Sequence, residues 1–245
     1  MDVIPSESVG GEKKNRVAYA TRETAKYVGA TATQYGMMVG VLAAIDLVHP
    51  PAIAAAPLFA FLSLRSRVFS LLDNSRPDRD AQDGKATPPD VKRPAWTPPG
   101  IAFPFIWLTI TALRAASSAI VYAKTGALAT PPLRAMALHL AIGDTWNTIT
   151  NCERRLGVSA VGCLAVWGSV LRATLAYAAV SPVAAKVLAP SLAWISVACV
   201  LTTNIWLLND KRPLYPSPDD GTSAPLRLAN LLQLQPNSIG GRQGE

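Results

Sequence analysis

Apolar residues in this chain gather in long continuous runs that charged segments separate. A soluble helix would instead alternate apolar and polar positions with a period of 3.6 residues. As helices, runs of about 20 residues match the ~30 Å hydrocarbon layer of a bilayer and satisfy their own backbone there. The pattern therefore predicts an all-α, multi-pass membrane bundle, with spans at 28–48, 52–72, 100–123, 133–151, 158–180 and 184–209.

Composition agrees with a membrane location. Of the 245 residues, 50% are hydrophobic and only 16% are charged, which is unusual for one or two soluble domains. The net charge of +7 resides mainly in segments between the apolar runs, where no aromatic residues interleave with the basic ones as in a nucleic-acid site. We therefore expect the lipid bilayer and its anionic headgroups, and not nucleic acid, as the partner of this charge.

The distribution of lysine and arginine predicts an orientation. If all six runs cross, the basic residues outside them fall mainly on the side of the two termini, and only Lys124, Arg134 and Lys186 lie opposite. The positive-inside rule then places both termini in the cytosol. The alternative is five spans, with residues 28–72 forming one element kinked at Pro50 and Pro51, which would move the N-terminal charges across the membrane.

Two stretches carry a family resemblance, "PAWTPPGIAFPFIW" from Pro94 and "SPVAAKVLAPSLAWISVACVLTTNIWLLN" from Ser181. The anchors are Pro94, Trp96, Pro98, Pro99, Phe103, Pro104, Trp107, Pro190, Trp194, Trp206 and Asn209. On these residues the chain resembles the TspO/MBR family, the tryptophan-rich sensory and translocator proteins, over about 94–209. The family is a five-helix membrane bundle, usually a dimer, whose pocket takes tetrapyrroles, sterols and drug-like aromatic molecules.

The resemblance divides the chain. Residues 52–209 are expected to form the family bundle, with a charged linker at 73–95, and residues 28–51 an additional transmembrane helix. A polar N-terminal arm, 1–27, precedes this helix. It has no short apolar core with a cleavage signal, so no secretory signal peptide is expected, and its early acids argue against a transit peptide. The tail, 210–245, is rich in proline and polar residues and is expected to be disordered, like the linker.

Several aromatic residues expected in the family pocket are missing. Ile101 replaces a tryptophan, Gly143 begins a stretch that keeps only the second tryptophan of the family's Asn-Trp-x-Trp, and Thr202-Thr203 replaces an asparagine and an aromatic residue. The resemblance implies a protein that binds a porphyrin- or haem-type tetrapyrrole or a sterol, for transport, sensing or stress regulation. The losses favour an alternative, an assembly subunit that kept the fold but lost the pocket and docks other membrane proteins.

Three charged residues are predicted near the middle of their spans: Arg114, Asp144 and Arg172 each lie about 15 Å, at 1.5 Å per residue, from a polar span end. Such charges usually face a bundle interior. We hypothesise that Asp144 pairs with both arginines and that the excess positive charge meets an anionic group such as a porphyrin propionate. The alternative is a cluster that only joins helices. The expected ligand-binding residues are Trp107, Arg114, Asp144, Trp146, Arg172 and Trp194.

No enzyme is predicted, because no nucleophile, base and orienting group occur together. A porphyrin-degrading activity, which the resemblance also suggests, is a third alternative. His49 and His139 have no partners at metal-ligand spacing, and no metal site is expected. Cys152, Cys163 and Cys199 form no C-x-x-C pair and are interpreted as small buried residues. The sequence does not distinguish a mitochondrial, plastid, endoplasmic reticulum or plasma membrane.

Overall fold

A computed structural model describes residues 6–73, 75, 91–221 and 223–227, and all regular elements in these ranges are helical. The all-α fold expected from the sequence is therefore confirmed. Short 3₁₀ turns, η1 (Ala52–Ala54) and η2 (Ser66–Phe69), flank α2. The helices are α1 (Ser6–Asp46), α2 (Ala55–Arg65), α3 (Ala102–Thr125), α4 (Pro131–Asn151), α5 (Leu156–Val180) and α6 (Pro182–Leu208).

The helix ends follow local sequence signals. Pro131 and Pro182 open α4 and α6, at positions where a missing N–H costs no helical hydrogen bond. The Ser181 hydroxyl accepts a hydrogen bond from the backbone N–H of Ala184 at 3.3 Å and caps α6. Gly126 ends α3 with φ of 71°, a left-handed conformation that glycine adopts without strain.

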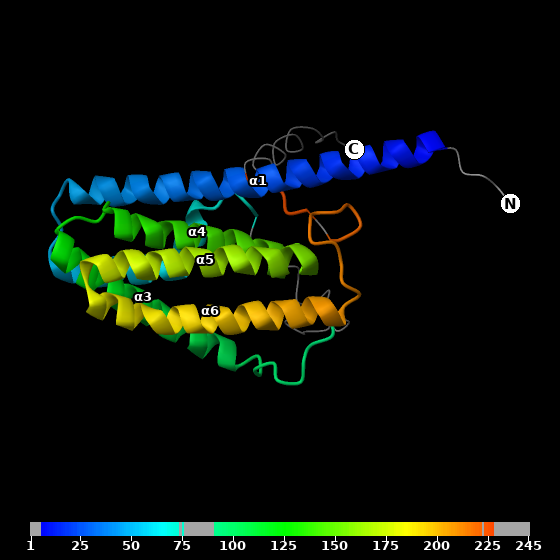
Figure 1. The fold of residues 1–245 in the computed structure, drawn as a ribbon. Coiled ribbons are helices and arrows are strands. Elements are labelled where there is room, and N and C mark those ends of the chain that lie inside the picture. The colour runs from blue at the N-terminus through cyan, green and yellow to red at the C-terminus, as the bar shows by residue number, and fades with distance from the viewer. Residues whose placement is uncertain (1–5, 74, 76–90, 222, 228–245) are drawn as a thin grey trace, which may run out of the picture.

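Five helical segments of the described chain are long and apolar enough to cross a membrane: Glu12–Asp46, Ala52–Phe69, Ala102–Thr125, Leu156–Val180 and Pro182–Leu208. The sixth predicted span corresponds to α4, which is less apolar because it carries Asp144, Asn147 and several threonines. In Figure 1, α4 lies between α1 and α5, and more than half of its residues are buried. Enclosure by neighbouring helices is what makes such polar groups tolerable inside a bundle.

The first helix differs from the expected division into a polar arm and a separate span. Residues 6–46 form one continuous helix of 41 residues, whose N-terminal end extends past the bundle in Figure 1. The segment contains no proline, so nothing in its backbone ends the helix where the polar arm meets the apolar run. The arm and the additional span are therefore one element.

Contacts at three levels hold α1 to the other helices. At its C-terminal end, the Asp46 carboxylate accepts hydrogen bonds from the backbone N–H groups of Leu128 and Ala129, at 2.6 and 2.8 Å. In the middle, Gln34 donates to Asp144 at 2.7 Å. Nearer the N-terminus, Tyr27 donates to Glu153. The additional helix is thus an integral part of the bundle.

The expectation of a disordered tail is wrong for the residues after α6 that the structure describes. Residues 213–221 and 223–227, called here the C-terminal strap, fold back over the bundle, and Leu226 pairs with Leu72 in an isolated antiparallel bridge. Three residues of the strap itself are buried: Ser217, Asp220 and Ala224. Composition pointed to disorder, but the strap finds polar partners on other segments. The linker residues 76–90 and the tail 228–245 lie outside the described residues, as do the basic residues counted there.

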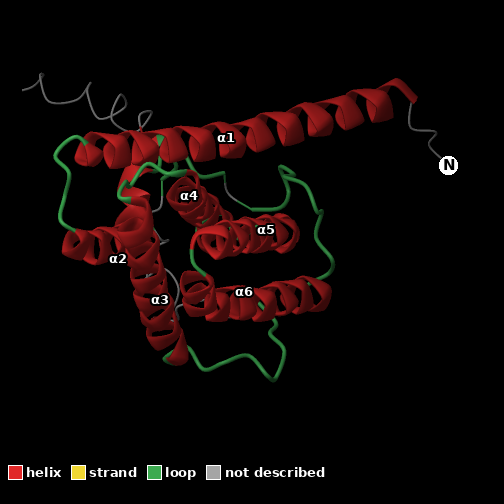
Figure 2. Ribbon diagram, turned by 60° about the vertical axis from the view of Figure 1, so that its left-hand side comes forward, coloured by secondary structure: helices red, strands yellow, loops and turns green. Residues whose placement is uncertain are grey.

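The bundle has an apolar half and a polar half. Met38, Leu42, Phe59, Leu133 and Leu188 belong to the largest apolar core, near the turn between α1 and α2. Figure 2 shows α3 crossing beside α2 and the ends of α4, α5 and α6. The other half, where α2 ends and α3 begins, contains the cavity described below.

Candidate functional site

A cavity of about 790 Å³ lies in the polar half of the bundle, within the ~300–1,000 Å³ range of small-molecule sites. The end of α2, η2, α3 and α4 form most of its wall, and α5 and α6 contribute Val166 and Ile195. Four of the six predicted ligand-binding residues line it: Trp107, Arg114, Asp144 and Trp146.

Arg114 is the deepest charge of the cavity. It lies near the midpoint of α3 and is only 7% exposed. Its Nη2 lies 2.7 Å from His139 Nε2, and because a guanidinium only donates, Nε2 must accept. The His139 proton then resides on Nδ1, which donates to Ser169 Oγ at 2.9 Å. Arg114 therefore has a neutral hydrogen-bond partner and forms no ion pair within the described part of the chain, and its buried Nε has no hydrogen-bond partner.

Asp144 has partners other than the predicted ones. Its carboxylate accepts hydrogen bonds from Gln34 Nε2 at 2.7 Å and from Ser66 Oγ at 2.5 Å, and it forms an ion pair with Arg67 Nε at 3.4 Å. No ion pair to Arg114 or Arg172 occurs within the described part of the chain. The predicted three-residue cluster is therefore wrong, and Asp144 instead joins α4 to α1 and η2.

Arg172 and Trp194 are not among the residues that line the cavity. Ser169, Val170 and Ala173 face the interior of the bundle, and this rotation of α5 leaves Arg172 exposed on the outside. Trp194 packs edge-on against Phe103, with ring centroids 6.3 Å apart. Its Nε1 is buried and unpartnered.

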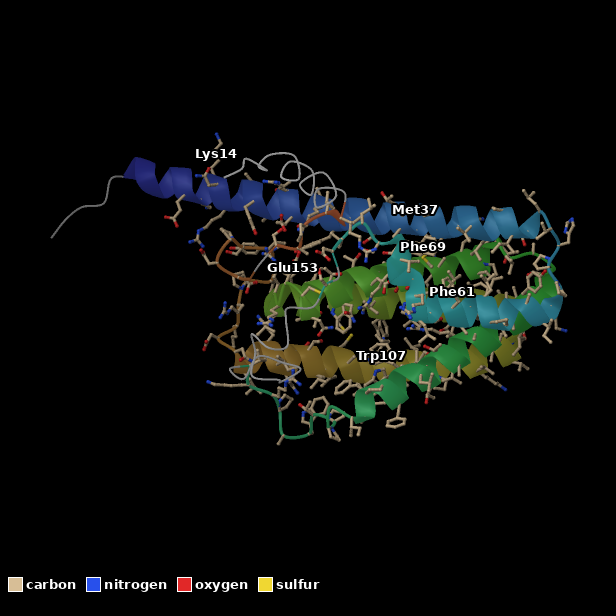
Figure 3. All side chains as sticks on the ribbon, turned by 180° about the vertical axis from the view of Figure 1, so that it is seen from behind. Lys14, Met37, Phe61, Phe69, Trp107 and Glu153 are labelled. Carbon is tan, nitrogen blue, oxygen red and sulfur yellow. The ribbon has the colours of Figure 1, made fainter. Side chains whose placement is uncertain are left out.

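The two tryptophans of the cavity come from different helices. Trp107 belongs to α3 and lies near α6 in Figure 3. Trp146 belongs to α4, and its indole N–H donates to the backbone carbonyl of Ser159 at 2.9 Å, which fixes the ring against α5. Both rings therefore border the cavity from a fixed helical scaffold, one of them locked by a hydrogen bond.

Sequence reasoning missed several residues of this site. Arg65 and Arg67 line the cavity, and neither was among the expected ligand-binding residues. Gln34 and Ser66 act through Asp144. A lone amide inside an apolar run was the available signal for Gln34, because buried polar groups in membrane spans need partners. Arg227 lines the cavity from the strap, and no local signal predicts that contact.

A second set of buried charges lies away from the cavity and is called here the Glu153 cluster: Tyr19, Glu23, Lys26, Tyr27, Glu153 and Arg155, with strap residues Ser217 and Ala224. Glu153 accepts from Tyr27 and, at 2.7 Å, from the backbone N–H of Ala224, and it pairs with Arg155 at 3.1 Å and Lys26 at 3.4 Å. Figure 3 shows Glu153 between α1 and the bundle.

Arg155 is the cation at the centre of the cluster. It is fully buried, and its Nη groups donate to the Ser217 carbonyl at 2.9 Å and to the Tyr19 hydroxyl at 2.7 Å. The cluster therefore ties α1, the turn between α4 and α5, and the strap together.

Comparison with known proteins assigns part of this architecture. The model of the TspO/MBR family matches residues 74–207. The human Translocator protein is 30% identical over 119 residues, which cover 47% of this chain and 70% of that protein. Protein CrtK of Rhodobacter capsulatus is 29% identical over 121 residues, 49% of this chain and 76% of that protein.

The Tryptophan-rich protein TspO of Bacillus cereus is 27% identical over 119 residues, which cover 49% of this chain and 78% of that protein. The residues that match the family include α3 to α6. They exclude α1, α2 with its flanking 3₁₀ turns, and the strap.

Proposed function

The chain belongs to the TspO/MBR family, and from this premise we propose that its cavity binds a hydrophobic aromatic ligand. A tetrapyrrole of the porphyrin or haem type is the favoured ligand and a sterol the second, with a role in transport, sensing or stress regulation. The observation that carries the proposal is the buried Arg114 guanidinium, which lines the cavity with a neutral histidine as its partner and its Nε unpaired.

The charge of the cavity favours an anionic ligand. Four arginines line it, at 65, 67, 114 and 227, against two carboxylates, Asp73 and Asp144. A porphyrin propionate is an anion that accepts the paired hydrogen bonds of a guanidinium, whereas a sterol hydroxyl is neutral and does not balance the excess positive charge. Trp107 and Trp146 supply flat surfaces for the macrocycle. The groups that we propose to contact the ligand are therefore Trp107, Arg114 and Trp146. Asp144 lines the same cavity, and we propose that it positions Arg67 and Ser66 in the wall.

Binding rather than catalysis is the activity that we propose. His139, the one titratable imidazole of the cavity wall in the described chain, is engaged by Arg114 and Ser169. No nucleophile stands beside it in the cavity lining, so porphyrin breakdown is a lesser alternative. We also propose that the termini face the cytosol, with residues 13–26 and 92–93 accessible from the same side.

The experiment that tests this proposal compares two forms of one ligand. Purified protein in phospholipid vesicles is titrated with protoporphyrin IX and with its dimethyl ester, and quenching of tryptophan fluorescence is measured. A charge-assisted contact contributes about 1.5–3 kcal/mol, so we expect the dicarboxylate to bind about ten- to hundred-fold more tightly. Equal affinities would refute the role of the arginines, and binding of neither form would refute porphyrin as the ligand.

A second candidate function is membrane assembly, in which this chain docks a second copy or another membrane protein. Gly29, Gly36 and Gly40 lie on the exposed side of α1, and a Cβ added at any of them would meet nothing within 4 Å. Small residues on such a face let another helix approach closely. The test is Gly36→Leu with Gly40→Leu: a changed complex size in native membranes with unchanged porphyrin binding supports assembly, and an unchanged size contradicts it.

A further inference from the structure

Two thiols from neighbouring helices meet away from the cavity. Cys199 on α6 donates a hydrogen bond to Cys163 on α5, with 3.1 Å between the two sulfur atoms. Cys199 Sγ also lies 3.3 Å from the backbone carbonyl of Cys163. Cys163 is fully buried, and Cys199 is partly exposed.

The contact is close to the geometry of a bond. A disulfide needs sulfur atoms about 2.05 Å apart, so the two sulfurs have only about 1 Å to close. The helices are already held together, because Ser181 alone separates α5 from α6 and the two pack along their length. Because the two helices are already packed together, the sulfur atoms can approach by rotation of the Cys199 side chain, and bond formation requires no large shift of α5 or α6.

The surroundings limit which reagents can reach the pair. The Thr202 hydroxyl lies beside the Cys163 thiol and donates to the backbone carbonyls of Ala198 and Cys199, at 2.8 and 3.2 Å. Cys163 lies about 10 Å along α5 from Leu156, and Cys199 about 13 Å along α6 from Leu208, at 1.5 Å per residue. Both thus lie within the membrane-spanning length of their helices, where charged thiol reagents such as glutathione are excluded and apolar oxidants dissolve.

We propose that Cys163 and Cys199 form a thiol–disulfide redox site whose oxidant is an apolar organic hydroperoxide, such as an oxidised lipid. The sulfur of the more exposed Cys199 attacks the O–O bond of the hydroperoxide and becomes a sulfenic acid, while its thiol proton passes to the other oxygen, which leaves as an alcohol. The Cys163 sulfur then attacks Cys199 Sγ, the S–S bond forms, and water leaves with the remaining proton. Two thiols lose two electrons, and the O–O bond gains them.

The disulfide would link two walls of the cavity. Val166 lies three residues after Cys163 on α5, and Ile195 lies four residues before Cys199 on α6, so each cysteine is about one turn from a lining residue. The bond would fix α5 against α6 at this level. Its formation needs no ligand in the cavity, so the redox site and the ligand site are independently testable.

The test uses the full chain in phospholipid vesicles. Cumene hydroperoxide is added, the protein is denatured, free thiols are alkylated, and peptides are mapped by mass spectrometry. We expect alkylation at Cys152 alone, a cross-linked peptide joining Cys163 and Cys199 that dithiothreitol releases, and a rate at least about tenfold above that with glutathione disulfide. Cys152→Ser should keep the cross-link, and Cys199→Ser should abolish it.

Three results would overturn the proposal. The first is a Cys163 and a Cys199 that both remain alkylatable. The second is oxidation of either residue to a sulfinic acid without a cross-link. The third is a reaction with glutathione disulfide as fast as with the hydroperoxide, which would contradict the apolar oxidant. The wild-type peptide map alone decides the first two, whether or not the variants fold.

Discussion

The cavity and the Glu153 cluster both contain buried charged side chains, but the hydrogen-bond and ion-pair partners of these charges differ. In the cluster, Glu153 receives two hydrogen bonds and two ion pairs from α1, the strap and Arg155. In the cavity, Arg114 meets a neutral imidazole and retains an unpaired Nε. Removing a charge from water costs several kcal/mol, so a buried guanidinium that forms no close ion pair in the described chain favours an anionic partner from outside it.

The difference separates structure from binding. In the cluster, the charged groups form hydrogen bonds and ion pairs with one another and with the strap backbone. These contacts join α1 and the strap to the family bundle. The cavity is open, and its arginines outnumber its carboxylates. Residues of the cluster should therefore change stability, and residues of the cavity should change ligand affinity. Each prediction below tests one side of this division.

The largest expected effect is on stability, from Glu153→Gln. The substitution removes the charge that faces Arg155 and Lys26, and a buried pair that loses one partner typically costs about 3–5 kcal/mol. The free energy of unfolding in detergent micelles measures this loss. Glu12→Gln is the matched control, because the Glu12–Arg16 pair is exposed and should contribute less than about 1 kcal/mol. A similar small loss for Glu153→Gln would contradict a structural role.

A smaller effect is expected where the strap meets α5. A Cβ at Gly157 would lie 2.0 Å from the Pro213 carbonyl oxygen, a backbone atom that only moves with the strap. Gly157→Ala should therefore destabilise docking of the strap by about 1–3 kcal/mol, seen as faster hydrogen exchange in residues 213–221 and 223–227. Gly168→Ala lies in the same helix with nothing within 4 Å of its Cβ. Equal exchange in both variants would show that the strap is not held at Gly157.

The smallest expected effect depends on pH. Burial raises the pKa of Asp220 to about 6 from 3.8, although the charges of Arg212 and Arg155 act in the opposite direction. A folded-state pKa above the unfolded value means that the docked strap binds the proton more tightly, so docking should strengthen as the pH falls from about 7 to about 4.

Hydrogen exchange of the strap, corrected for the intrinsic rate, measures the pH effect. Asp220→Asn removes the titrating group and should remove the response while keeping the side chain nearly the same size. A wild-type strap that docks more weakly at pH 5.5 than at pH 7.5 would contradict the sign of this prediction.

Much of the bundle was predictable because each membrane span is a long apolar run of residues. Such a run does not predict how the helix is rotated about its axis. Since α5 is apolar nearly all round, its sequence does not indicate that Ser169 faces inward and Arg172 outward. Depth along a helix follows from residue count, and Arg114 and Asp144, both expected near the middle of their spans, line the same cavity. Their partners depend on rotation and neighbours, which residue count does not give.

The strap shows a second limit of sequence reasoning. Lys26 contacts Ser223 at 2.7 Å and Ala224 at 3.0 Å, across nearly 200 residues of chain. Proline and polar residues in a tail favour disorder only when no partner exists, and here the partners lie on α1 and beside Glu153. A contact of this kind has no local signal, so composition alone gave the wrong expectation.

The measurement that tests the central claim most directly is porphyrin affinity in two arginine variants, Arg114→Gln and Arg172→Gln. Both remove one positive charge from an apolar span, but Arg114 lines the cavity and Arg172 is exposed on α5. We expect Arg114→Gln to weaken protoporphyrin IX binding about tenfold or more and Arg172→Gln to leave it unchanged. Unchanged binding in Arg114→Gln, or an equal loss in both variants, would contradict the claim that the cavity charge awaits an anionic ligand.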